Sequence, residues 1–68
     1  MIYIGIVTQR GGVVCVRTRK DISSVQKELD GWLGAAFDNE EDEATIWDQD
    51  GEDVALYDPV TDTWEVYG

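Results

Sequence analysis

Carboxylates dominate the second half of this 68-residue chain, and they are the residues whose type and spacing could do chemistry. Residues 35–68 contain twelve Asp and Glu but no Lys or Arg, which gives this half a net charge of −12. Residues 1–34 contain all five basic residues and three acids, which gives +2. Charges of the same sign repel one another, so we expect a chain that keeps such a stretch to use it to bind a positively charged partner.

The spacing of these acids suits a row of fixed charges. Residues i and i+2 of a strand lie on one face about 6.6 Å apart, and Glu41/Glu43 and Asp48/Asp50 have that spacing. Each strand of duplex DNA carries a phosphate about every 3.4 Å, so carboxylates from neighbouring turns and strands can approximate a phosphate row. A merely solubilising surface is the alternative. The candidate partner-binding residues are Asp38, Glu40, Glu41, Asp42, Glu43, Asp48, Asp50, Glu52 and Asp53, with the aromatic residues Trp47 and Tyr57; Asp58, Asp62 and Trp64 are further candidates.

Several other chemistries do not fit these residues. With no His and one Cys, a zinc site built on Cys and His and a Ser-His-Asp triad cannot form within one chain. The acidic segment 48–53 suggests a calcium loop, but Gly51 at its sixth position would place Ile46 and Tyr57 where carboxylate ligands are needed. We therefore assign no catalytic residue, no metal ligand and no cofactor, and an enzyme is disfavoured.

Composition places the chain among small globular proteins. The length predicts one domain over residues 1–68, and a hydrophobic content of 43 % is too high for a disordered acidic tail. The single cysteine, Cys15, rules out an intrachain disulfide and favours a cytoplasmic location. We expect no signal peptide and no membrane span. The negative charge disfavours direct binding to nucleic acid or to anionic membranes.

Alternating and β-branched residues predict five strands and one helix. Gly11 and Gly12 can supply positive φ in a first turn, and Asp50-Gly51 is a strong hairpin signal. Short turns make neighbouring strands antiparallel. The first strand is apolar on both sides and is expected to be central in the sheet. The predicted strands are 1–8, 13–19, 44–48, 54–57 and 63–67, the predicted helix is 22–33, and 37–43 is predicted to be an acidic loop.

The predicted helix has one apolar face and recognisable ends. Asp21 or Ser23 can cap its first amides, and Gly34 can end it. The chain is therefore predicted to be an α+β domain of order ββαβββ, with one helix packed on one face of a bent antiparallel sheet. The helix residues expected in the core are Ile22, Val25, Leu29, Trp32 and Leu33.

Residues 55–66 resemble the hairpin of a kelch repeat, through Tyr57-Asp58-Pro59, a Thr and Trp64. The chain has no second copy, and a propeller needs several blades. We therefore interpret the resemblance as local turn chemistry. Pro59 presets the turn, Asp58 and Asp62 bond nearby amides, and Tyr57 pairs with Trp64 across the hairpin.

The basic residues Arg10, Arg17, Arg19 and Lys20 surround the first hairpin. We expect them to offset acids of the second half within the fold. A second contact patch, or head-to-tail self-association of opposite charges, is the alternative. Cys15 lies among valines and is expected to be a buried apolar residue without a reactive role.

In size, charge and single-domain α+β layout, the chain resembles the small acidic inhibitors that phages encode against host defence: anti-CRISPR proteins, anti-restriction proteins and uracil-DNA glycosylase inhibitors. This resemblance implies a stoichiometric inhibitor in the host cytoplasm that occupies the basic nucleic-acid channel of a nuclease or CRISPR effector. The alternatives are an interaction module, such as an immunity or assembly protein, for a basic partner unrelated to nucleic acid, and a metal-binding domain. An exposed edge strand also leaves a homodimer open.

Overall fold

A computed structural model describes residues 1–67, with Ala36 described by its backbone alone. The five strands are β1 (Tyr3–Gln9), β2 (Gly12–Arg19), β3 (Asp42–Asp48), β4 (Asp53–Asp58) and β5 (Thr63–Val66). Helix α1 (Ile22–Leu29) follows β2, and two short 3-10 turns, η1 (Asp30–Trp32) and η2 (Gly34–Ala36), lead to β3. One helix and five antiparallel strands confirm the predicted α+β class. The predicted order is matched in part, because the two 3-10 turns were not expected.

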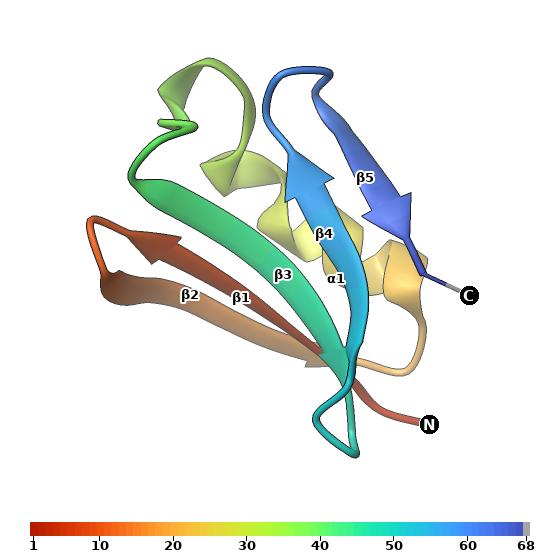
Figure 1. Cartoon of the computed structure of the whole chain (residues 1–68). Coiled ribbons are helices and arrows are strands. Elements are labelled where there is room, and N and C mark those ends of the chain that lie inside the picture. Colours follow the sequence, from red (N-terminus) through yellow and green to blue (C-terminus); the bar gives the residue numbers. More distant parts are fainter. Residues whose placement is uncertain (68) are drawn as a thin grey trace.

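The strands form one antiparallel sheet in the order β2-β1-β3-β4-β5 (Figure 1). The apolar first strand is thus flanked on both sides, as predicted, and the β2–β1 and β3–β4–β5 groups are hairpins formed by chain neighbours. This order separates the charges in space, because the basic residues lie on the first turn, β2, α1 and the connection between β2 and α1, whereas the acids of the second half lie on and beside β3, β4 and β5.

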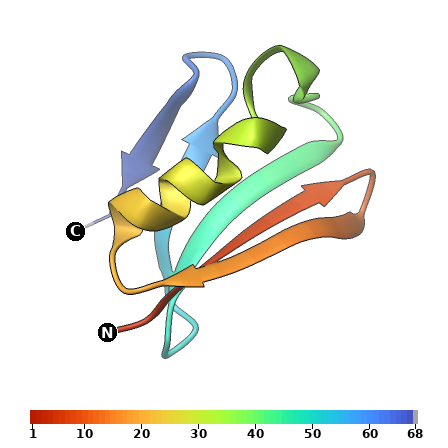
Figure 2. The ribbon, with the colours of Figure 1, turned by 180° about the vertical axis from the view of Figure 1, so that it is seen from behind.

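Helix α1 covers only one face of the sheet, which we call the inner face (Figure 2). The buried core lies between them and includes Val25 and Leu29 of the helix. Gly5 of β1 lies directly beneath these two side chains, because a Cβ built on Gly5 would approach Val25 Cγ1 to 2.3 Å. The other buried members of the core are Val7, Cys15, Ala44, Ile46, Ala55 and Tyr57.

The α-helix ends at Leu29, four residues before the predicted end at residue 33. Gly31 disfavours a further α-helical turn, and the chain continues as the 3-10 turn η1. Trp32 and Leu33 still pack against the core, as predicted. At the other end of the helix, the Asp21 side chain accepts a hydrogen bond from the Ser24 amide (2.9 Å), which confirms Asp21 as the N-cap.

Two turn predictions need correction. The first hairpin turns at Arg10 and Gly11, which have φ values of 53° and 81°, so the left-handed residue beside Gly11 is Arg10 rather than Gly12. A two-residue type I′ turn requires positive φ at both central residues, and β2 already begins at Gly12. The acidic segment 37–43 is a loop only as far as residue 41, because Asp42 and Glu43 pair with β1 as the first residues of β3.

Candidate partner-binding surface

The fold places the predicted acidic residues at the two ends of β3. One group, which we call the loop-end cluster, surrounds the start of β3 and the β4–β5 turn (Figure 1). The other, the hairpin-end cluster, lies on the β3–β4 turn at the opposite end of the molecule (Figure 1). The loop-end cluster comprises Asp38, Glu40, Glu41, Asp42, Asp58 and Asp62, and the hairpin-end cluster comprises Asp48, Asp50 and Glu52.

About half of these carboxylates hold their own turns in place. Asp38 accepts hydrogen bonds from the amides of Glu40 (2.9 Å) and Glu41 (3.4 Å). Asp42 accepts one from the Asp38 amide (2.9 Å), and Asp58 accepts one from the Val60 amide (2.9 Å). These three aspartates of the loop-end cluster are thus held in definite positions by backbone amides.

Asp48 is the clearest case of a structural carboxylate. Its side chain is 8 % exposed and accepts hydrogen bonds from the amides of Asp50 (2.9 Å) and Glu52 (3.0 Å). The predicted role of Asp48 as a contact residue is therefore corrected: it orders the β3–β4 turn on which Asp50 and Glu52 are exposed. Strands flank this turn, whereas helices flank the calcium loop of an EF-hand.

Tyr57 also leaves the set of contact residues, because it is 5 % exposed and belongs to the core. Its ring packs edge-on against Phe37 and Trp64, with centroids 5.0 Å and 5.6 Å apart, which confirms the predicted Tyr57–Trp64 pair. Its hydroxyl donates to the Asp62 carboxylate and accepts from the Gly34 amide (3.3 Å). The bond to Asp62 raises the pKa of Tyr57 above its ordinary 10.0, and burial adds to this.

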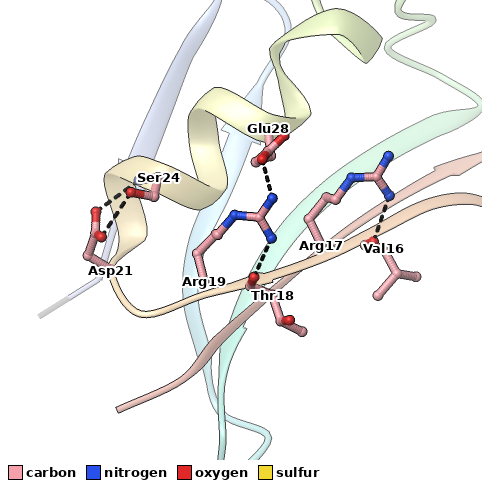
Figure 3. A network of polar contacts seen from close by, with 7 residues as sticks. All are labelled: Val16, Arg17, Thr18, Arg19, Asp21, Ser24 and Glu28. Carbon is pink, nitrogen blue, oxygen red and sulfur yellow. Dashed lines mark hydrogen bonds and ion pairs between the residues drawn. The ribbon is translucent and has the colours of Figure 1, made fainter.

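The basic residues neutralise very little of the acidic half. Among residues 1–67, the only ion pair between the two halves joins Arg10 Nε to Glu41 (3.5 Å), and both side chains are largely exposed. Arg19 pairs instead with Glu28 of α1 and donates to the Thr18 carbonyl (Figure 3). The expected offset of charge within the fold is therefore confirmed only at Arg10, and eleven of the twelve acids in the second half have no cationic partner in the part of the chain described.

The structure adds a surface that the sequence analysis did not predict as a whole, although Trp47 on it was a candidate contact residue. The face of the sheet opposite α1, which we call the outer face, is not covered by any described element (Figures 1 and 2). Many of its side chains are nevertheless apolar, and Val16 and Trp47 are 47 % and 37 % exposed. Glu43, Asp53 and Glu65 add carboxylates to this face on its β3–β5 side. The apolar character of both sides of the first strand was the sequence signal for this face. Its central residues are Ile4, Ile6, Val16, Thr45, Trp47 and Leu56.

Comparisons with protein-family models, curated proteins and solved structures found no match for this chain. Within residues 1–67, no helix has the length and apolar character needed to cross a membrane. No group of three or more potential metal ligands comes together within the described residues. The candidate surface is described from the structure of this chain alone. It consists of the two acidic clusters and the outer face between them.

Proposed function

We propose that this protein is a stoichiometric inhibitor that occupies a basic, nucleic-acid-binding surface of a host defence protein, of the anti-CRISPR or anti-restriction type. The observation that supports this proposal is the absence of cationic partners for eleven acids on the β3–β5 side of the described chain. A fold that leaves so much charge of one sign unpaired loses stability by self-repulsion. Lys and Arg of a partner would relieve that repulsion on binding.

The dimensions of the acidic surface are compatible with mimicry of nucleic acid. Strand β3 has seven residues, so its two ends lie roughly 20 Å apart at about 3.4 Å per residue. That length corresponds to about six phosphate steps along one strand of duplex DNA. The two acidic clusters would then engage basic residues that normally bind phosphates several steps apart, and the turn hydrogen bonds would keep the carboxylates fixed.

The mechanism is competition for the same basic residues. Electrostatic attraction between the acidic clusters and a positively charged channel speeds association and weakens as salt is added. Nucleic acid and the inhibitor would exclude each other. The inhibited protein would therefore fail to bind its nucleic acid, while its catalytic residues would stay unchanged. The protein itself needs no catalytic group or cofactor for this role.

One observation favours a second candidate function, an interaction module for a basic protein that does not bind nucleic acid. The outer face between the two acidic clusters includes the apolar side chains of Ile6, Val16 and Trp47, and a surface that only imitates phosphates does not need apolar residues. Protein–protein interfaces combine an apolar core with a polar rim in this way.

Capture from a bacterial lysate at low salt, followed by a challenge with duplex DNA, separates the two candidates. We expect a captured nucleic-acid-binding protein that excess DNA releases. Three variants with equal changes in net charge locate the surface: E40K/E41K in the loop-end cluster, D50K/E52K in the hairpin-end cluster, and E28K/D30K on the helix side as the matched control. The first two should lose the partner and the third should keep it.

A partner that DNA does not release would support the interaction module instead. Equal binding by all three variants would refute an acidic binding surface. The substituted positions are exposed, and their carboxylates accept no hydrogen bond from the backbone, so each variant should fold. Circular dichroism of each variant shows whether a loss of binding reflects unfolding.

A further inference from the structure

The outer face contains a groove that combines aromatic rings with carboxylates. The groove has a volume of about 270 Å³ and is lined by residues of β3 and β4 and by Tyr67, which follows β5. Trp47 and Tyr67, 37 % and 43 % exposed, supply two aromatic rings. Its lining residues are Glu43, Thr45, Trp47, Asp53, Leu56 and Tyr67, together with the backbone neighbour Ala55.

The sheet register explains why these residues meet. Trp47 lies opposite Asp53 and Thr45 lies opposite Leu56 in the β3–β4 pair, where a register shift between Ile46 and Trp47 brings Asp53 to the outer face. The Tyr67 amide donates to the Val54 carbonyl (2.8 Å), which extends the β4–β5 pairing by one residue and places Tyr67 beside β4. The groove is thus formed by paired strands rather than by loops, and its walls are correspondingly fixed.

The two carboxylates of the groove differ from those of the turns. Glu43 and Asp53 are exposed and form neither an ion pair nor a hydrogen bond through their side chains within residues 1–67. By contrast, Asp38, Asp42 and Asp48 accept backbone hydrogen bonds. No Lys or Arg occurs anywhere in residues 35–68 to occupy the groove from the neighbouring strands.

We propose that this groove binds an arginine side chain of the partner protein and that the apolar outer face around it is the anchor of the complex. A guanidinium stacks on aromatic faces and donates hydrogen bonds from its edge to carboxylates, and it is more weakly hydrated than an ammonium group. Trp47 and Tyr67 offer the faces, and Glu43 and Asp53 offer the carboxylates. This inference rests on the proposed function, to which it adds the contacting face and the type of side chain recognised.

The apolar residues beside the groove add the second part of the argument. Ile4 and Ile6 of β1 and Val16 of β2 continue the outer face away from the acids, so the surface is apolar at one side and acidic at the other. A partner that fits it has apolar residues next to an arginine. A second copy of this chain is a poor occupant, because its net charge is −10 and two acidic sides would have to approach each other.

The test measures binding of a fluorescein-labelled hexa-arginine peptide, with hexa-lysine as the comparison, by fluorescence anisotropy at low and physiological salt. We expect hexa-arginine to bind about three- to five-fold more tightly than hexa-lysine, as a cation–π contact at an exposed site implies. The W47L variant keeps the face apolar and should remove this preference while leaving the affinity for hexa-lysine unchanged.

Charge is tested with two variants of equal net charge. E43Q/D53N removes both groove carboxylates and should weaken hexa-arginine binding about ten-fold. The comparison variant D50N/E52Q removes two exposed carboxylates of the acidic surface that lie outside the groove, and it should also weaken binding, but by less than about three-fold. Thermal unfolding of each variant verifies that the fold is intact.

Three results would overturn the groove as an arginine site: equal affinities of the wild-type protein for both peptides, equal losses in the two charge variants, or a wild-type dimer that W47L dissociates. Equal losses would leave the proposed acidic surface standing, since both variants would still weaken binding. If neither charge variant weakened binding, the electrostatic basis of the proposed function would fail together with the groove.

Discussion

Gly5 should be one of the least replaceable residues of this protein, because α1 rests directly on it. A Cβ at this position would lie 2.3 Å from Val25 Cγ1 and 2.9 Å from Leu29 Cδ1, whereas carbon atoms in contact prefer about 3.5–4.0 Å. Both helix residues are fully buried, at 0 % exposure, so neither side chain has free space to move into. The G5A substitution must therefore lift α1 from the sheet or force Val25 out of its rotamer.

The expected cost follows from these contacts. Overpacking of a core costs about 1–3 kcal/mol, and replacing a strand glycine returns about 0.5–1 kcal/mol of backbone entropy. We expect a net loss of about 1–2 kcal/mol, out of a total free energy of unfolding of about 3–10 kcal/mol for a chain of this length. For a small domain this corresponds to a fall in Tm of about 5–15 °C.

Urea unfolding followed by tryptophan fluorescence and circular dichroism measures the change. G31A is the matched control: Gly31 has no atom within 4 Å of a built Cβ, so this variant should be unchanged or stabilised by up to about 1 kcal/mol. The double variant G5A/V25A should lose less stability than the two single losses combined, because V25A removes the closest contact. A G5A protein as stable as the wild type would refute the close seating of α1 on β1.

Three further predictions concern the groups that hold the turns, the helix and the last hairpin. D48A should lower the free energy of unfolding by about 1–3 kcal/mol in urea titrations, because two turn amides lose their buried acceptor, and D48N should lose less. D21A should lower Tm at pH 7, with D21S restoring part of the loss. Hydrogen bonds from Ser23 and Ser24 hold the pKa of Asp21 below 3.8, so the contribution of its charge is present above about pH 4 and disappears as the pH falls through the lowered value. Tyr57 has the opposite sign: its raised pKa stabilises the fold below pH 10, and this is lost as the pH rises through the folded-state value. Thermal scans of Y57F should therefore show a smaller alkaline loss than the wild type, and an equal loss would contradict the Tyr57–Asp62 contact.

The candidate site shows where reasoning from the sequence succeeds and where it stops. The acidic residues and their lack of interleaved cations are visible in the sequence. The sequence does not show which acids order a turn and which are exposed. Asp48 and Asp50 are alike in the sequence, yet Asp48 is buried against turn amides and Asp50 is exposed. Tyr57 and Trp47 are both strand aromatics followed directly by an Asp, and only Trp47 faces outward. The difference depends on which side of the sheet the helix covers.

Features that depend on near neighbours along the chain can be predicted from the order of the residues. Alternation of β-branched residues, the Asp50-Gly51 turn and the Asp21 cap predict strands, a hairpin and a helix start because their hydrogen bonds and backbone angles involve residues a few positions apart. The concentration of acids after residue 35 is likewise a property of the sequence.

The tertiary structure alone decided which residues are available to a partner. Placing β1 between β2 and β3 joins residues about 40 positions apart, as Ile4 and Trp47 show, and a single helix can cover only one face of the resulting sheet. The register shift between Ile46 and Trp47 then brings Asp53 beside Trp47. The exposure of each side chain, and with it the groove of the outer face, depends on these long-range contacts. The local pattern of residues does not predict them.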